Sequence, residues 1–411
     1  MNTCELRDAI ARQQIGWTLE APFYTSSALF EYERRTWLAD QWFILGHVSE
    51  VREPGAYIVR DLLGESIIVS RDEEGTLRAF YNVCPHRGSR ICEKDGHGGN
   101  LVCPYHAWTF RLNGSLRSAS ALPETAEVGK LGLRGISVRE IGGLIFGSLN
   151  AAPAQLDAMR KAAEPTLNYH GIPEARVAAR RSYPTCANWK LVMENFFECY
   201  HCYPNHPEVC SVLEALVDNQ ARKQTPESTA QWLDCMGRWL REEADPHAPA
   251  LEVIEQQRAQ FYNFLIGCAP IGKGFKTASR DGLPIAPLMG KMTKFDGGLR
   301  SLVLEPFVHF TCHNDHAVMF QFNPTAPELT DVIITWIVDG AAAESDVDIE
   351  RMVWLWDVTT KQDQVLIERN AAGVRSLSYR SGPYSLIESW TSQMVARYLK
   401  GFSNLCQIEQ T

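Results

Sequence analysis

Two short cysteine–histidine pairs constrain this chain more than any other feature of its sequence. One reads Cys84-Pro-His86 and the other Cys103-Pro-Tyr-His106, so each loop offers one thiolate and one imidazole. A [2Fe–2S] cluster with mixed ligation takes both thiolates on one iron and both imidazoles on the other. A single zinc ion also accepts two sulfur and two nitrogen ligands, but zinc fingers usually pair Cys with Cys and His with His. The mixed pairs therefore favour the cluster, with Cys84, His86, Cys103 and His106 as its ligands.

The cluster loops, CPHRGS and CPYHAW, resemble those of Rieske non-heme iron oxygenases, and the resemblance extends over nearly the whole chain. Neither loop has the additional cysteine of high-potential respiratory Rieske proteins. A potential in the lower part of the Rieske range, roughly −150 mV, is therefore expected. The resemblance implies a terminal oxygenase component in a head-to-tail homotrimer. Electrons from NAD(P)H would reach the cluster through a separate flavin and iron–sulfur reductase. From the cluster they would pass to a mononuclear Fe(II), which uses O₂ to hydroxylate a small organic substrate.

Length and charge narrow the class further. A chain of 411 residues has room for two or three domains. Its net charge of −9 argues against a nucleic-acid partner. No stretch approaches 18 uninterrupted apolar residues and the start lacks the pattern of a signal peptide, so we expect no membrane span and a cytoplasmic protein. Most of the twelve cysteines are then expected to be reduced.

The pattern of secondary structure predicts an α+β fold in three parts. Residues 1–41 form a helical segment, with an N-cap at Ser26 or Ser27, that packs on the catalytic domain. Residues 42–160 read as a small antiparallel β domain that carries the cluster, with a hairpin at Asn113-Gly114. Residues 161–411 form the catalytic domain, an antiparallel sheet flanked by helices and, by resemblance, of the helix-grip type. The elements expected there are helices over 187–203, 227–264, 348–370 and 386–398, and strands within 299–312, 317–324 and 331–340.

A second metal site is predicted at the end of the helix over 187–203. His201 lies before the helix break at Pro204 and His206 lies just after it. Two histidines and one carboxylate form a facial triad, which leaves positions on Fe(II) open for O₂ and substrate. On a continuous helix, Glu194, Glu198 and His201 would share one face.

The carboxylate is expected from the helix over 348–370. Asp363 falls in a largely apolar row with Met352, Trp356, Thr359 and Leu366, where an unpaired charge would be costly. Asp357 and Glu368 fall in a mostly polar row and are expected to be solvated surface charges. Asp363 is therefore the predicted third ligand.

The sequence Glu198-Cys-Tyr-His201-Cys202 resembles the oxygenases of carnitine, glycine betaine and proline betaine, which carry Glu where many Rieske oxygenases have Asp. The resemblance implies that Glu198 bridges a cluster histidine of one subunit to an iron-ligand histidine of the next. A carboxylate that accepts an imidazole N–H orients the ligand and raises its basicity. Glu194, one turn earlier, is expected to be structural.

The same resemblance favours hydroxylation of an N-methyl group on a betaine-like cation, which leads to demethylation. Aromatic rings could hold the cation by cation–π attraction. The candidates are Phe196, Phe197, Phe307, Phe310 and Trp356. Plain core packing is an equal alternative for each, and His309, His313 and His316 could line the pocket instead.

Two other functions stay open. One is hydroxylation or O-demethylation of an aromatic acid, which an Arg or Asn facing a carboxylate in the pocket would favour. The other is a Rieske ferredoxin, an electron carrier without a second metal. A ferredoxin needs only about a hundred residues, so the segment from Asn188 to Asp363 counts against it.

Overall fold

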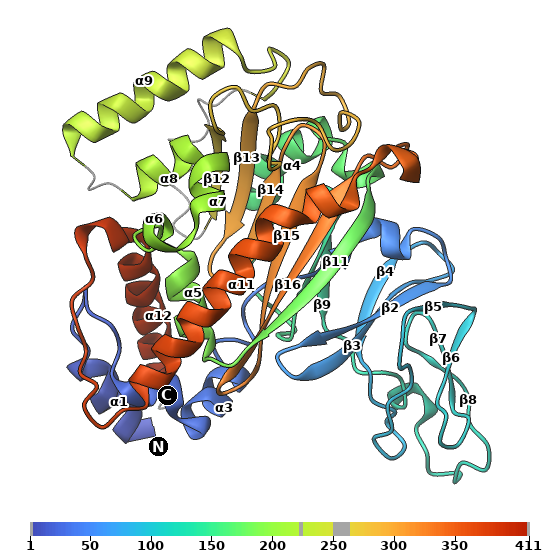
Figure 1. The fold of residues 1–411 in the computed structure, drawn as a ribbon. Coiled ribbons are helices and arrows are strands. Elements are labelled where there is room, and N and C mark those ends of the chain that lie inside the picture. The colour runs from blue at the N-terminus through green and yellow to red at the C-terminus, as the bar shows by residue number, and fades with distance from the viewer. Residues whose placement is uncertain (1–2, 222–224, 250–263, 409–411) are drawn as a thin grey trace.

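The computed structural model describes residues 3–221, 225–249 and 264–408, and it has the α+β class expected from the sequence. Figure 1 shows a β-rich region, coloured blue to teal, beside a larger sheet covered by helices. Among the described residues, none of the helices combines the length and apolar character that a membrane span needs.

Ten short strands between residues 43 and 148 form three antiparallel sheets, in the orders β1-β10-β9, β4-β3-β2-β5 and β6-β7-β8. The hairpin expected at Asn113-Gly114 joins β7 to β8, and the positive φ of 85° at Gly114 suits the turn. The strands are β1 Phe43–His47, β2 Ala56–Leu62, β3 Glu65–Arg71, β4 Leu77–Tyr81, β5 Gly96–His97, β6 Asn100–Val102, β7 Thr109–Arg111, β8 Leu116–Ser118, β9 Ser137–Ile141 and β10 Leu144–Ser148.

The larger region is built on a six-stranded antiparallel sheet in the order β11-β16-β15-β14-β13-β12. The expected strands over 299–312, 317–324 and 331–340 are present as four of the six. The strands are β11 Arg176–Thr185, β12 Phe264–Pro270, β13 Gly298–Leu304, β14 Val308–Cys312, β15 Ala317–Ala326 and β16 Leu329–Val338.

Two strands and part of one helix differ from the sequence-based expectation. β11 was not predicted from its sequence, RVAARRSYPT. This edge strand exposes Arg181 and Ser182, so it lacks the alternation of apolar and polar residues that indicates a strand. The helix expected over 227–264 is α9 Pro226–Glu242, and Phe264 instead begins β12. Residues 250–263 of that expected helix lie outside the described residues.

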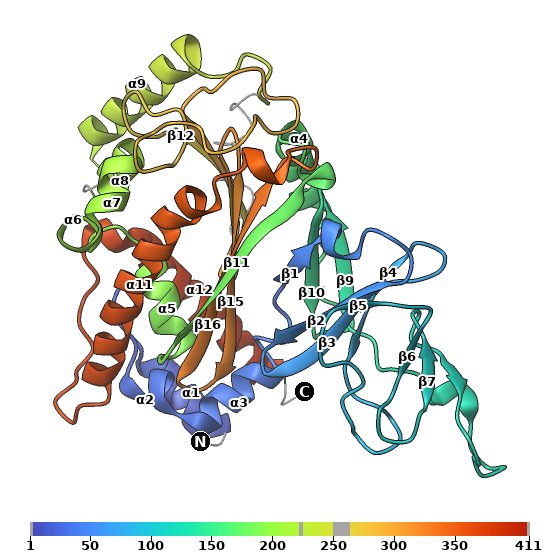
Figure 2. The same ribbon diagram turned by 45° about the vertical axis from the view of Figure 1, so that its right-hand side comes forward.

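The two faces of the large sheet are covered by different elements. Figure 2 shows the long helix α11 Ile349–Val374 and the shorter α5 Trp189–Phe196 on one face. Phe320 on β15 belongs to the core on that side, whereas its neighbour Met319 packs with α4 Asp157–Tyr169 on the other side. This alternation decides which strand residues can reach the site.

The N-terminal helices contact α5 and the C-terminal helix α12 Ser389–Ile408. The Lys190 ammonium pairs with the Glu33 carboxylate at 2.6 Å in the interior, and the Tyr24 hydroxyl donates to Glu194 at 2.8 Å. Burial raises the pKa of Glu194 to about 7. Ser26 caps α3 Ser27–Arg35 by accepting from the Leu29 N–H, as expected. The other helices are α1 Thr3–Arg12, α2 Ala21–Thr25, α6 Cys202–Asn205, α7 Pro207–Val212 and α8 Glu214–Gln220.

Three fully buried histidines gather where α4 ends against the β14–β15 turn. His170, His313 and His316 are each at most 1% exposed. Both ring nitrogens of His170 and of His313 lack a hydrogen-bond partner in the described parts of the chain. Burial lowers the pKa of His170 to about 3. His313 and His316 are therefore core residues and do not line the pocket described below.

We expect His170→Gln to make folding less sensitive to acid. Below pH ~6.5 the unfolded wild-type chain binds a proton at His170 that the folded protein does not accept until about pH 3. The free energy of unfolding of the wild type therefore falls by roughly 1.4 kcal/mol per pH unit as the pH falls through that window. The variant lacks this histidine and does not lose that stability. Urea unfolding at pH 7.5 and pH 5 measures the difference, with the exposed His97→Gln as control. A stability difference between His170→Gln and wild type that does not change with pH would contradict it.

Candidate active site

The two cluster loops share one turn geometry. In the first, the Gly88 N–H donates to the Cys84 carbonyl at 2.9 Å, and in the second the Ala107 N–H donates to the Cys103 carbonyl at 3.0 Å. Gly88 and Ala107 both have positive φ, 80° and 57°. A left-handed alanine is strained by roughly 1–2 kcal/mol, so the second loop holds its turn at a cost.

The loops bury both thiols and expose both imidazoles. Cys84 and Cys103 are 1% and 2% exposed, while the rings of His86 and His106 lie 4.7 Å apart on the surface. Burial opposes ionisation of Cys103, but backbone N–H groups of the loop lower its pKa overall. Trp108 stacks on His86 with centroids 4.7 Å apart and fixes that ring. The donor set fits a cluster with an inner iron held by sulfur and an outer iron held by nitrogen.

These four residues do not crowd around one point as zinc ligands would. Among the described residues, the only group of three or more His, Cys, Asp or Glu ligand atoms within 4.8 Å of one another is that of His201, His206 and Asp363. The wider spacing of the cluster loops suits two irons bridged by sulfide better than one tetrahedral ion.

The helix that leads to the second site ends earlier than expected. α5 stops at Phe196, and the Glu198 carboxylate accepts the backbone N–H groups of Tyr200 and His201. This local bonding offers the backbone an alternative to continuing the helix. Glu194, Glu198 and His201 therefore do not share a helical face, and that part of the prediction is wrong. Pro204 does not break a helix either, because it lies in the first turn of α6, where proline is tolerated.

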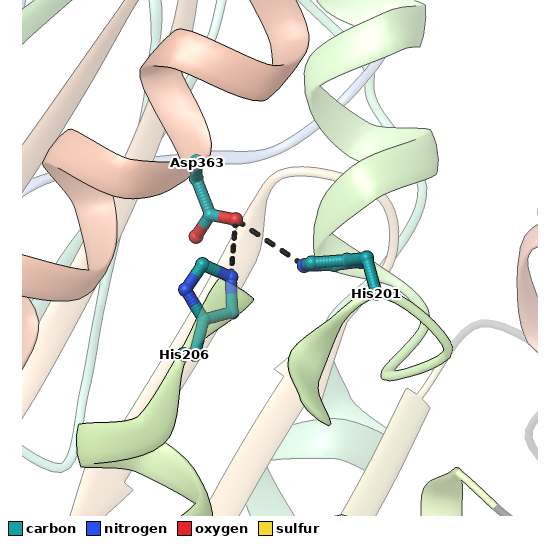
Figure 3. Close-up of side chains that lie close together, drawn as sticks. All are labelled: His201, His206 and Asp363. Atoms are coloured by element: carbon teal, nitrogen blue, oxygen red, sulfur yellow. Dashed lines mark hydrogen bonds and ion pairs between the residues drawn. The ribbon is translucent and has the colours of Figure 1, made fainter. Parts of the chain in front are cut away.

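The structure nevertheless brings His201, His206 and Asp363 together. Figure 3 shows the Asp363 carboxylate, from α11, pointing at both imidazole rings, which come from either end of α6. Its Oδ1 lies 2.8 Å from His206 Nε2 and 3.2 Å from His201 Nε2. Burial opposes the charge on Asp363, but the two histidines lower its pKa overall. Two imidazole nitrogens and one carboxylate oxygen facing one point fit a facial triad for Fe(II).

Each histidine is oriented from behind by an acceptor on Nδ1. Glu198 Oε1 lies 2.5 Å from His201 Nδ1, and Gln362 Oε1 lies 2.8 Å from His206 Nδ1. Both contacts leave Nε2 free to face the metal position. Gln362 was missed by the sequence analysis, although its place beside Asp363 was a usable signal. Glu208 holds Gln362 in turn by accepting from its Nε2 at 3.1 Å.

Replacing Gln362 with leucine should weaken iron binding roughly 10- to 100-fold, because His206 would lose the acceptor that fixes its ring and tautomer. Iron per subunit after dialysis against graded chelator measures the change. Gln41→Leu, which removes an amide bonded to the Trp37 carbonyl, is the matched control. Equal iron retention by the two variants would contradict the role of Gln362.

Asp357 and Glu368 are paired residues and not the solvated charges that were expected. Asp357 accepts from the Tyr183 hydroxyl at 2.7 Å and forms an ion pair with Arg181 at 2.6 Å. Glu368 accepts the Cys186 N–H at 3.0 Å. Both residues lie on the side of α11 that packs against β11 and the residues that follow it. The strand β11 was not predicted from the sequence. Neither residue belongs to the triad.

An apolar pocket opens beside Asp363. Its aromatic wall consists of Phe196, Phe320, Phe322 and Trp356, in which Phe196 lies 4.6 Å from Phe322 and Phe320 lies 4.9 Å from Trp356. The other lining residues are Thr185, Val192, Asn195, Val332, Thr360, Asp363, Gln364 and Ile367. Phe196 and Trp356 were candidates from the sequence, whereas Phe320 and Phe322 were missed.

Three of the aromatic candidates lie in the core instead. Phe307 stacks on Phe43 at 4.5 Å, and Phe197 is 7% exposed within the same core. Phe310 faces the α4 side of the sheet. Its strand neighbour His309 faces the pocket side, where its ring meets Phe196 at 5.0 Å. Side chains alternate between the two faces of a strand, so on β14 it is His309, and not Phe310, that faces the pocket.

Known proteins combine the same two regions. The ring hydroxylating alpha subunit (catalytic domain) family matches residues 172–401, and the Rieske [2Fe-2S] domain family matches residues 41–131. The chain is 35% identical over 385 residues to the glycine betaine monooxygenase oxygenase subunit of Chromohalobacter salexigens, covering 92% of this chain and 84% of the relative. It is 29% identical over 403 residues to the carnitine monooxygenase oxygenase subunit of Escherichia coli strain K12, covering 96% and 94%. A solved quaternary ammonium Rieske monooxygenase shares the fold, with a TM-score of 0.72 at 24% identity, covering 96% of this chain and 98% of that one.

Two Cys/His loops on a β region, together with a group of two histidines and one carboxylate on helices that flank an antiparallel sheet, are the arrangement of an iron-dependent oxygenase. The chain belongs to the Rieske non-heme iron oxygenases and is a terminal oxygenase component. Its cofactors are a Rieske [2Fe–2S] cluster and a mononuclear iron, and a separate reductase supplies its electrons.

Proposed function

We propose that this oxygenase hydroxylates an N-methyl group of a betaine-like quaternary ammonium compound, which then releases formaldehyde and the demethylated amine. The observation that carries the proposal is the aromatic wall of Phe196, Phe320, Phe322 and Trp356 beside Asp363. A desolvated cation gains about 2 kcal/mol or more from such rings. The relatives named as glycine betaine and carnitine monooxygenase subunits support the same substrate class.

In this proposal Cys84, His86, Cys103 and His106 hold the cluster, and His201, His206 and Asp363 hold the iron. When bound, the cluster supplies single electrons and the iron supplies the site of oxygen chemistry. The aromatic wall orients the cation so that one methyl group faces the triad, and it excludes water from that methyl group. Glu198 keeps a proton on His201 Nδ1, and so holds Nε2 toward the metal position.

Electron transfer between subunits is part of the proposal. The cluster loops lie at the far edge of the β-rich region, on the opposite side of the molecule from α6 (Figure 2). That separation favours a head-to-tail homotrimer, in which the cluster of one subunit serves the iron of its neighbour through Glu198. The electron donor would be a flavin and iron–sulfur reductase that uses NAD(P)H. A cytoplasmic location stays a prediction.

The pocket composition weighs against an aromatic acid as substrate. Among the residues that line it in the described structure there is no Arg or Lys to hold a lone carboxylate. Asn195 is present, but its Nδ2 lies 3.3 Å from His201 Nε2 and faces the triad. A zwitterionic betaine carries its own counter-charge and needs no basic partner.

The proposal is tested by NADH-dependent O₂ uptake with a surrogate reductase. Glycine betaine, carnitine and proline betaine are compared with benzoate, vanillate and phthalate, and formaldehyde is measured in each. We expect uptake and formaldehyde in equal amounts with one of the betaines. Uptake tied to product with an aromatic acid, and none with any betaine, would overturn the proposal.

A further inference from the structure

Two polar side chains on the pocket side of the large sheet have no partner. Thr311 is 2% exposed, and its Oγ1 makes no hydrogen bond within the described residues. The His309 ring makes edge contacts with Phe196 at 5.0 Å and Phe320 at 5.4 Å, but no hydrogen bond to any part of the chain that the structure describes. Burial lowers the pKa of His309 to about 4, and no charged group offsets this effect. His309 is half-buried, whereas Thr311 is fully buried, and a buried hydroxyl is normally paired, so the lack of a partner for Thr311 calls for an explanation.

The strand register places both groups beside the aromatic wall. His309 pairs with Phe320 across β14 and β15, and Thr311, two residues further, pairs with Val318. Residues two apart on a strand share a face, so His309 and Thr311 are neighbours on the surface that faces α5. Phe320 contacts both Trp356 and His309, at 4.9 Å and 5.4 Å. One phenyl ring therefore links the wall proposed for the cation to His309, and Thr311 lies two residues further along the same face of β14.

We propose that His309 and Thr311 form the subsite that receives the carboxylate of the betaine, and so determine specificity for zwitterions over simple quaternary cations. The inference rests on the proposed function and extends it to the other end of the same substrate. A neutral imidazole offers one N–H and the threonine one O–H, which suit a carboxylate whose charge is already balanced by the ammonium group of the same molecule. The short betaine would lie with its methyl groups toward Asp363 and its carboxylate toward β14.

The alternative is that His309 is a plain core residue, and the two explanations differ in their dependence on substrate. A core role predicts equal effects of a substitution on every ligand. A carboxylate subsite predicts weaker binding only for ligands that carry the carboxylate, because a charged hydrogen bond is worth a factor of roughly 10 to 100.

The experiment measures equilibrium dissociation constants by calorimetry on the protein with both metal centres, for glycine betaine and for tetramethylammonium. Thr311→Val is nearly isosteric and His309→Phe keeps an aromatic ring, so both remove donors with little change of volume. We expect each to weaken glycine betaine binding roughly 10-fold or more and to leave tetramethylammonium unchanged. His309→Gln, which keeps an N–H donor, should recover much of the loss. Thr325→Val, whose hydroxyl donates to the Leu329 carbonyl at the far hairpin, is the matched control.

Each outcome decides one question. If wild-type protein neither binds nor oxidises any betaine, the proposed function fails and this inference fails with it. If the wild type oxidises glycine betaine but Thr311→Val and His309→Phe bind it normally, only the subsite is wrong. Equal losses for glycine betaine and tetramethylammonium would also overturn it, in favour of a packing role. Should His309→Phe lose its metals, Thr311→Val alone decides.

Discussion

Alanine in place of His201, His206 or Asp363 should remove the mononuclear iron and abolish turnover while the Rieske absorption and EPR signals remain. Iron should fall from about three to about two per subunit, because one cluster holds two irons and the triad holds one. Among the described residues, the proposed ligand atoms of these three side chains lie within 4.8 Å of one another, and each residue offers one of them. Iron and acid-labile sulfide analysis, with O₂ uptake, measures the result.

Asp357→Asn is the matched control on the same helix. Asp357 is held by Tyr183, Arg181 and Lys361, and lies outside the triad. The Asp357→Asn variant should lose some stability, because the contact between α11 and β11 is weakened, but it should retain all the iron. Loss of the mononuclear iron in Asp357→Asn but not in Asp363→Ala would show that the wrong carboxylate has been chosen.

His201, His206 and Asp363, which the sequence predicts as one group, lie together in the structure, whereas the bounds of the elements that carry them were predicted less well. The pairs around Cys84 and Cys103 are local patterns, and the loops need only short-range hydrogen bonds to form. Asp363 could be identified because a charge in an apolar helical row is costly without a partner. Neither inference required knowledge of how distant segments pack.

Features that depend on packing were harder to predict. The side chain of Glu198 competes with the helix for backbone N–H groups, so α5 ends at Phe196, and no helical periodicity contains that information. Phe310 was chosen as an aromatic near the site, but only the pleat of β14 tells that His309 faces the pocket instead. Gln362 reaches His206 across two elements that are far apart in sequence.

Glu198→Gln should keep both metal centres but slow reoxidation of the reduced cluster by substrate and O₂, roughly 10- to 100-fold. The carboxylate lies 2.5 Å from His201 Nδ1, so it can take up the imidazole proton as an electron arrives. A neutral amide still accepts the hydrogen bond but cannot take the proton, and for this reason we expect a change in rate with little change in structure. Glu198→Asp should be intermediate, since it keeps the charge and loses reach. Stopped-flow absorbance of the pre-reduced cluster gives the rate.

Glu208→Gln provides the comparison, because Glu208 lies behind His206, the other histidine of the proposed triad, through Gln362. It contacts Gln362 and not an imidazole, so its amide removes a nearby charge without touching a proton on His201 or His206. If charge near the iron were all that mattered, the two variants would slow reoxidation equally. If Glu198 accepts the proton of His201 as the electron arrives, only Glu198→Gln should be slow, and its deficit should shrink as the pH rises and solvent accepts the proton more readily. Unchanged single-turnover kinetics in Glu198→Gln would mean that electrons reach the iron by a route that does not involve this residue.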